Sequence, residues 1–294
     1  MDEITAVLSK PLELADAFLP VSTTAWEEAI RRDLKGASYE EKLVWRTAEG
    51  IRVRPYYRRE DISPRGPLLR PSRSWEVIAP DATPDLSVSA IEFHLEGATA
   101  VQELAFALAQ AADLLAADRP VVTLGFAVGS NHFMEIAKLR AARLLWTQVA
   151  AAFGCPGSGI RIHACTASLD KTEGDPYMNL LRVTTEALSA IFGGCDSLTV
   201  RPCGFDPHLA ENVHHILQEE SHLDNVADPA AGSYYVETLT DELARAAWKL
   251  FQEIEAAGGF SRYQESGSLT LALAEARAAR EKEASSPKGG QPAA

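Results

Sequence analysis

Cysteine is scarce in this sequence, and its spacing argues against two classes of protein. The 294 residues include four cysteines, at positions 155, 165, 195 and 203, and no two of them form a C-x-x-C pair. A disulfide-stapled secreted domain or a cysteine-rich zinc site would need paired or regularly framed cysteines. We therefore expect reduced thiols, a cytoplasmic location and no bound metal.

Positive charge and long apolar runs are also in short supply. The chain has 28 Lys and Arg residues against 41 Asp and Glu residues, a net charge of −13. Such a chain is a poor binder of nucleic acid and of anionic membranes. No apolar run reaches the roughly 18 residues that a membrane span needs, and the first 18 residues lack the basic segment of a signal peptide. We expect neither nucleic acid nor a membrane as a partner.

Several motifs of common enzyme classes are absent or incomplete. There is no P-loop, no G-x-G-x-x-G after a predicted strand and no G-x-S-x-G. "DPHLAE" at 206–211 ends in Glu211 and so falls short of D-x-H-x-x-G, the cobalt-ligating motif of base-off cobalamin domains. Its first two residues are explained as a helix cap. His214 and His215 point about 100° apart on a helix, so they do not form a metal site.

The regular part of the sequence begins near residue 86. From there, apolar runs rich in β-branched residues alternate with patterns of helical periodicity. The runs are 86–93, 120–128, 159–167 and 196–204. Continuous apolar character indicates strands that are buried on both faces of a parallel sheet. We predict an α/β fold with a partial TIM-barrel-like (β/α) repeat of about four βα units, half of the eight that close a barrel.

The segments on either side of this repeat differ in composition. A short amphipathic helix is predicted over 23–37, with Thr24 as its cap, and a hairpin-like alternation follows it. Residues 52–73 contain seven arginines and four prolines, which are typical of an extended arm. The domains that we expect are an N-terminal arm and linker, a (β/α) half-barrel, and a helical then disordered tail. Their bounds are 1–80, 81–262 and 263–294.

Two of the predicted strand ends carry candidate site residues. His94 and Glu96 follow the first run, where His94 is a candidate general acid or ligand contact and a polar loop is the alternative. Asn131 follows the second run and is a candidate substrate contact. Glu135 and Lys138 are spaced as a helix-surface pair, so we expect them on a solvated face.

A third predicted strand carries the most suggestive pair of side chains. Arg161 and His163 lie two residues apart and therefore project to the same face of a strand. Buried cationic groups are costly unless they are paired or bind an anion. We expect a role for this pair inside the barrel. The arginines of 52–73 could grip phosphate groups, although an arm that docks on an acidic partner is favoured.

Long segments resemble the methylmalonyl-CoA mutase family. "WEEAIRRDLKGASYEEKLVWRTAEGIRVRPYY" is similar to the N-terminal arm of those chains. "FHLEGATAVQELAFALA", "NHFMEIAKLRAARLLW", "DPYMNLLRVTTEALSAIFGG" and "QEESHLDNVADPAAGSYYVETL" resemble the second half of their substrate barrel. The resemblance covers about residues 20–60 and 86–260. It implies a (β/α)₈ fold, adenosylcobalamin-dependent interconversion of methylmalonyl-CoA and succinyl-CoA, and a CoA chain that runs through the barrel.

The sequence also departs from the family's catalytic pattern. Phe93 stands near the position of a catalytic tyrosine, Cys165 where a substrate-facing glutamine is expected, and Arg201 where a substrate-contacting asparagine is expected. Nothing after about residue 260 resembles the cobalamin-binding domain. The first half of the barrel is missing, because residues 73–77 lead almost directly to the region of the fifth strand.

In these departures the sequence resembles the small subunits of mutases. Some bacterial mutases pair such a small subunit with a catalytic large subunit. We predict a non-catalytic partner of such a large subunit in a heterodimer, with adenosylcobalamin in the assembled enzyme but not bound by this chain. The alternative is a stand-alone acyl-CoA-binding homo-oligomer made of two half barrels. His94 and His163 would be its candidate catalytic residues, and Arg161, Asn131 and Arg201 its candidate substrate contacts. A degenerate product with marginal folding is a third reading.

Overall fold

The computed structural model describes residues 21–62, 68, 74–169, 171–172 and 174–285. The chain separates into two compact units. The smaller contains the residues up to Trp45 together with Arg52–Pro55, and the larger contains the remainder. The predicted disorder of the last residues lies outside the described part of the chain.

The smaller unit begins with two short helices. Helix α3 (Thr23–Asp33) confirms the helix predicted over 23–37, but its cap is Ser22 and not Thr24. Helix α4 (Tyr39–Leu43) is capped in the same way by Ser38. In both cases the serine hydroxyl accepts a backbone N–H that the first helical turn leaves unpaired.

Short elements follow these helices along the chain. Strands β1 (Trp45–Arg46) and β2 (Arg52–Val53) form a two-stranded sheet, which confirms the predicted hairpin at a shorter length. A 3₁₀ turn, η1, spans Arg59–Asp61. Most of the arginine- and proline-rich stretch beyond it, at 63–67 and 69–73, lies outside the described residues.

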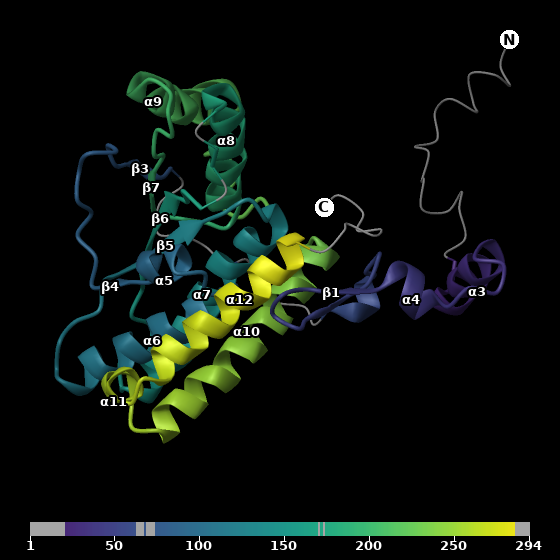
Figure 1. Cartoon of the computed structure of the whole chain (residues 1–294), viewed down its shortest axis with the longest axis horizontal. Coiled ribbons are helices and arrows are strands. Elements are labelled where there is room, and N and C mark those ends of the chain that lie inside the picture. Colours follow the sequence, from purple (N-terminus) through teal and green to yellow (C-terminus); the bar gives the residue numbers. More distant parts are fainter. Residues whose placement is uncertain (1–20, 63–67, 69–73, 170, 173, 286–294) are drawn as a thin grey trace, which may run out of the picture. The chain divides into compact units, whose positions relative to one another are not determined.

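The larger unit is built on a parallel sheet of five strands, which confirms the partial barrel-like α/β fold. The strands are β3 (Glu76–Val77), β4 (Val88–Ser89), β5 (Thr123–Val128), β6 (Arg161–Thr166) and β7 (Ser197–Thr199). Their order is β3-β7-β6-β5-β4, with every neighbouring pair parallel, and Figure 1 shows them side by side in this sequence. In a closed barrel of eight strands the first strand pairs with the last. The order therefore matches such a barrel with three consecutive strands removed.

Two details of the sheet differ from the prediction. Strand β3 lies in the segment assigned to the arm, and its pairing with β7 adds a fifth strand to the expected four. Strand β4 is shorter than the predicted run of 86–93, because Ile91–Leu95 forms helix α5. Ser89 supports this early turn into a helix, since its hydroxyl accepts from the N–H of Ile91 at 3.4 Å and donates to Glu92 at 2.6 Å.

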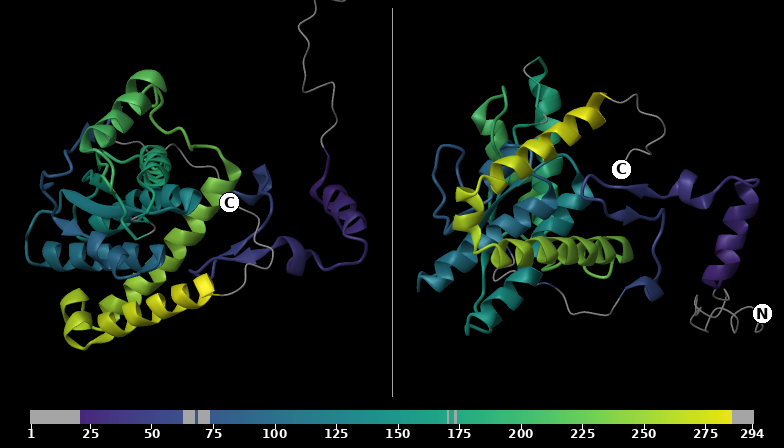
Figure 2. Two further views of the ribbon diagram at one scale, coloured as in Figure 1. Left: turned by 45° about the horizontal axis from the view of Figure 1, so that its top comes forward. Right: turned by 60° about the horizontal axis from the view of Figure 1, so that its bottom comes forward.

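Helices connect the later strands and cover the sheet. After α5 they are α6 (Ala100–Ala116), α7 (His132–Ala152), α8 (Pro176–Phe192), α9 (Pro207–His215), the π-helical turn η2 (Ile216–Glu220), α10 (Tyr234–Ala256), α11 (Phe260–Glu265) and α12 (Ser268–Ser285). Helix α10 packs on both α6 and α7, and Figure 2 shows it along its length. The capping box predicted for Thr99 and Gln102 is confirmed. None of the helices formed by the described residues combines the length and apolar character that crossing a membrane requires.

A single loop, residues 78–87, joins the two edge strands β3 and β4. Four inter-strand spacings, about 19 Å, separate these edges, and ten residues can span about 33 Å. The helical connections lead from β4 to β5, β6 and β7 in one direction across the sheet, whereas this loop leads from β3 to β4 in the opposite direction. Because parallel crossovers are right-handed, the loop and the helices belong on opposite faces. A Cβ built on Gly125 would lie only 2.6 Å from the Leu86 side chain, so the end of the loop is pressed against that opposite face.

We call this opposite face the lumen face. It carries Gly125 and Ala127 of β5, His163 and Cys165 of β6, and Ser197 and Thr199 of β7, because alternate residues of a strand share a face. Leu86 and Ile91 pack there against Ala127 and Cys165. In a complete barrel this face lines the interior, so the loop places its own side chain where an open channel would run.

Candidate functional site

A small polar cluster lies on the lumen face. His163 pairs in register with Ser197, and Cys165 pairs with Thr199. All four residues are at most 5% exposed. His163 therefore points into the barrel-like interior, as the sequence predicts, while a catalytic role for it stays a prediction.

The His163 ring is held as a neutral imidazole. Its Nδ1 lies 3.0 Å from the Ser197 hydroxyl. Burial, assisted by the positive charge of Arg201, lowers the pKa of His163 to about 4. A neutral imidazole can donate or accept a hydrogen bond near pH 7, but it supplies no positive charge to an anionic substrate.

Arg201 and Cys165 complete this cluster. The backbone N–H of Arg201 donates to the Thr166 hydroxyl at 2.8 Å, which fixes the chain as it leaves β7. Burial raises the pKa of the Cys165 thiol to about 11, although the charge and hydrogen bond of Arg201 oppose this rise. The thiol is thus unreactive as a nucleophile near neutral pH. The structure brings together His163 and Arg201, two of the residues selected from the sequence.

Arg161 does not join the cluster. It is the first residue of β6, and its side chain is 47% exposed. Its guanidinium forms a surface ion pair with Glu76 of β3 at 2.5 Å. The expectation of two buried cations on one strand face is therefore wrong for Arg161, because the strand begins there and the side chain reaches solvent. An exposed pair of this kind contributes little to stability.

His94 belongs to a buried ionic network and not to a strand end. It lies in α5, and its Nδ1 is 2.7 Å from Oε1 of Glu103 in α6. The other Glu103 oxygen accepts from Nζ of Lys138 in α7 at 2.7 Å, and Lys138 also contacts Glu135 at 2.6 Å. All four side chains are at most 7% exposed. His94 thus links α5 to the helical layer.

This network corrects the expectation for Glu135 and Lys138. Both are buried, at 5% and 0% exposure, whereas their spacing predicted a solvated helix face. Helix α7 packs against α6, α8 and α10, so most of its surface has neighbours. Lys138 additionally donates to the Ala127 carbonyl at 2.8 Å, which ties the helix to β5.

Asn131 has a structural explanation in the local backbone. It is the N-cap of α7, where its side chain accepts from the backbone N–H of Met134 at 3.4 Å. The residue is exposed at the carboxyl end of β5, the edge at which barrel enzymes bind their substrates. A substrate contact by Asn131 stays a prediction, as it does for Arg161 and Arg201.

The two histidine motifs interpreted as non-metal sites have other contacts in the structure. Asp206 caps α9 by accepting from the backbone N–H of His208 at 3.0 Å, as predicted. The His208 side chain is 85% exposed and faces Glu211. His214 is buried and accepts at Nδ1 from the Trp75 indole at 3.2 Å. Among the described residues, no group of three His, Cys, Asp or Glu side chains is placed to hold a metal ion.

The neutral histidines predict a specific loss of stability in mild acid. Folded His163 and His214 each have a pKa lowered to about 4, against about 6.5 in an unfolded chain. Stability is fully present above the unfolded value and falls as the pH drops toward the folded value. Between pH 7.5 and 5.5 each histidine should lower the free energy of unfolding by about 1.4 kcal/mol.

Urea titrations at these two pH values test this expectation. His163→Asn keeps a polar group near Ser197. It should reduce the loss of unfolding free energy between the two pH values by the contribution of one histidine, about 1.4 kcal/mol. Replacement of the exposed His208 by asparagine serves as the control and should leave the loss unchanged. A pH dependence that is the same in wild type and His163→Asn would contradict the assignment.

Comparisons with known proteins identify the family. The methylmalonyl-CoA mutase family model matches residues 79–289. The methylmalonyl-CoA mutase small subunit of Porphyromonas gingivalis is 30% identical over 414 positions, which cover 89% of this chain and 67% of that subunit. The small subunit of Streptomyces virginiae is 45% identical over 193 residues, 59% of this chain and 31% of that protein. The methylmalonyl-CoA mutase of Escherichia coli is 37% identical over 214 residues, 66% of this chain and 30% of the enzyme.

The lengths of these alignments indicate how much of the relatives' sequence has no counterpart in this chain. Most of the relatives described are covered to about a third of their length. For the Porphyromonas subunit, 89% of this chain is about 262 residues within an alignment of 414 positions, so about 150 positions of the relative face a gap. A gap of this size agrees with a five-stranded remnant of an eight-stranded barrel. The chain is a member of the methylmalonyl-CoA mutase family.

Proposed function

We propose that this protein is a small-subunit-like, non-catalytic component of an adenosylcobalamin-dependent methylmalonyl-CoA mutase. It would pair with a large subunit that interconverts methylmalonyl-CoA and succinyl-CoA in the cytoplasm. The observation that carries the proposal is the open sheet. Five strands stand in barrel order, and the relatives that match it include proteins named small subunits.

The lumen face supports the non-catalytic part of the proposal. Leu86 and Ile91 occupy the space over Gly125, Ala127 and Cys165, where the family resemblance implies a CoA chain. Cys165 and Arg201 replace the glutamine and asparagine that the resemblance implies for substrate contact. The buried Cys165 thiol and the guanidinium that hydrogen-bonds it offer a different set of groups to a substrate.

The residues of this chain do not fit the cobalamin that the family implies. The D-x-H sequence at Asp206 is used to cap α9, and Glu211 stands in place of the motif's glycine. His208 is paired with that glutamate on the same helix, at 3.6 Å. The adenosylcobalamin of the assembled enzyme would therefore be held by the large subunit.

We propose that the sheet domain begins near residue 74, within the segment 1–80 that the sequence assigns to the arm. The pairing of β3 with β7 supports this limit. We propose that the partner contacts the rest of that arm and the outer edges of β3 and β4, which pair with no further strand among the described residues. Open sheet edges favour association unless they are covered, and a homologous large subunit is the partner that we propose for them.

Co-expression with a mutase large subunit from the same organism tests the proposal. We expect a 1:1 complex by native mass spectrometry, with mutase activity that is unchanged by His163→Asn in this chain. Separate chains at micromolar concentration would overturn the partner role. Loss of activity in the complex with His163→Asn, with the complex still formed, would overturn the non-catalytic role.

The same experiment addresses the second reading, in which two copies form an acyl-CoA site. The neighbouring His163 and Arg201 are the observation that favours it, because a guanidinium suits an anionic thioester substrate. A homo-oligomer that retains acyl-CoA and forms no complex with the large subunit would support this reading and contradict the first.

A further inference from the structure

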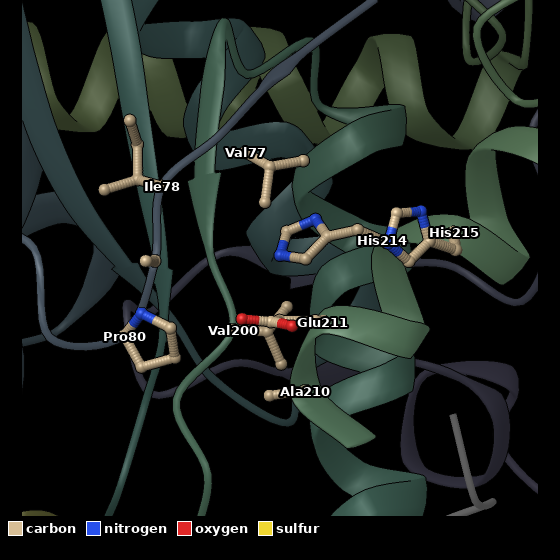
Figure 3. A pocket seen from close by; sticks show the side chains of 9 residues that line it. Val77, Ile78, Pro80, Val200, Ala210, Glu211, His214 and His215 are labelled. Atoms are coloured by element: carbon tan, nitrogen blue, oxygen red, sulfur yellow. The ribbon is translucent and has the colours of Figure 1, made fainter. Parts of the chain in front are cut away.

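A cavity lies between the carboxyl end of β3 and helix α9, away from the lumen-face cluster. Its volume is about 190 Å³. Val77, Ile78, Pro80 and Val200 form much of its wall, and Figure 3 shows their side chains around it. An apolar cavity of about 150 Å³ in a well-studied protein binds benzene, so this one is large enough for a small organic molecule.

His214 supplies a hydrogen-bond donor to the cavity. Its Nδ1 accepts from the Trp75 indole N–H at 3.2 Å, so in the neutral ring the proton resides on Nε2. Burial, together with the neighbouring His215, lowers the pKa of His214 to about 4, and the ring is neutral at pH 7. Figure 3 shows it between Val77 and Glu211, over the cavity. Among the described residues, no protein acceptor meets its Nε2–H.

Glu211 supplies an acceptor one helical turn away. Residues three apart on a helix share a face, and Figure 3 shows the Glu211 carboxylate directed into the same cavity as the His214 ring. The Glu211 side chain is 52% exposed and lies 3.6 Å from Nδ1 of His208. The cavity thus combines apolar walls with the His214 N–H donor and the Glu211 carboxylate acceptor on adjacent turns of α9, and the His215 ring also lines it.

We propose that this cavity is a binding site for a small aliphatic carboxamide. The carbonyl oxygen of the ligand accepts from Nε2–H of His214, and its amide N–H donates to Glu211. The aliphatic part lies against Val77, Ile78 and Val200. A carboxylate of the same shape is repelled by Glu211, and an amine leaves the His214 donor without an acceptor. This inference stands on α9 and β3 and does not depend on the mutase proposal.

Isobutyramide, isobutyrate and isobutylamine are matched probes for this site. We would titrate each into the full chain labelled with ¹⁵N-histidine and follow the His214 ring nitrogens by NMR. Isobutyramide should bind saturably and shift the His214 resonances, with at least about tenfold weaker binding of the other two, the effect of one lost hydrogen bond. Absence of saturable isobutyramide binding, or equal binding of isobutyrate, would overturn the proposal.

Two variants of α9 and one control complete the test. Ala210→Leu fills the cavity from its wall and should reduce isobutyramide binding at least about tenfold, whereas Asn212→Leu places a leucine on the exposed side of α9, outside the cavity lining, and should not. Glu211→Gln lies at an exposed position, which folding tolerates. Because it removes the charge that repels a carboxylate, it should reduce the ratio of isobutyramide affinity to isobutyrate affinity. If Ala210→Leu does not fold, the Glu211→Gln result decides, and an unchanged preference rejects the site.

Discussion

Replacing Lys138 by methionine is expected to lower the free energy of unfolding by about 3–5 kcal/mol, the usual cost of removing one partner from a buried ion pair. Lys138 is fully buried between Glu103 and Glu135, with its Nζ at 2.7 and 2.6 Å from their carboxylates. Methionine fills a similar volume but leaves both carboxylates without their cation. Urea unfolding at pH 7.5 measures the loss.

The pH dependence of this loss follows from the pKa shifts of the pair. Burial alone would raise the pKa of Glu103, but the charges of Lys138 and His94 outweigh it and hold that pKa below its usual range. Its stabilising contribution is therefore present above an unfolded pKa of about 4.3 and is lost as the pH falls through the folded value. For Lys138, burial is outweighed by Glu103 and Glu135, which raise the pKa. That contribution is present below about pH 10.4 and disappears as the pH rises through the folded value.

The methionine variant should thus show its full deficit between about pH 5 and 10 and a smaller one in acid, where protonation relieves the uncompensated carboxylates. Lys249→Met is the matched control on α10, because its side chain is 81% exposed, and it should change stability by less than about 0.5 kcal/mol. Adding Glu103→Gln and Glu135→Gln to Lys138→Met should recover part of the loss. A deficit that does not shrink in acid would mean that the carboxylates are not the cause.

The strands of this protein were predictable where their burial is continuous. Beyond their first residues, β5 and β6 are buried on both faces, and β7 is buried throughout, so the largely apolar runs that contain them locate these strands. Strand β3 has two residues, both exposed, and no pattern can mark so short a strand. It exists because the edge of β7 pairs with it, which is a tertiary effect.

Helix α5 shows how context overrides propensity. Two of the three residues of "IEF" at 91–93, Ile91 and Phe93, are apolar and favour strands. The chain nevertheless turns into a helix after Ala90, whose N–H makes a ladder hydrogen bond to the Gly125 carbonyl at 2.8 Å. The Ser89 hydroxyl then receives Ile91 N–H. The cue was a serine placed directly before the turn, and it was too weak to outweigh the apolar run.

The candidate site was less predictable than the sheet, because pairing partners lie far apart in sequence. Lys138 meets Glu103 across 35 positions, and the Trp75 indole meets His214 across 139. Spacing within one helix predicted a solvated Glu135–Lys138 pair, since it contains no information about what packs on that helix. The orientation of the His163 side chain was easier to predict, because it depends on the alternation of side chains along a single strand.

Replacing Arg140 should lower the free energy of unfolding as much as replacing Lys138 does. It should also loosen the segment 221–233. The Arg140 guanidinium forms buried ion pairs with Asp228 and with Glu237 of α10, the latter at 2.7 Å, and all three side chains are at most 7% exposed. Asp228 in turn accepts from the backbone N–H of Leu68 at 2.9 Å. Arg140→Met should lower the free energy of unfolding by about 3–5 kcal/mol, because two buried carboxylates lose their cation.

Limited proteolysis separates this effect from that of Lys138. The segment 221–233 between η2 and α10 contains Asp228, so its anchorage depends on Arg140, and cleavage within it should accelerate in Arg140→Met but not in Lys138→Met of equal global stability. Arg245→Met on α10, with a side chain 72% exposed, should leave both unfolding and cleavage near wild type. If 221–233 is cut no faster in Arg140→Met, the guanidinium does not anchor it. The network would then serve only to hold α7 against α10, and the stability loss alone would measure its contribution.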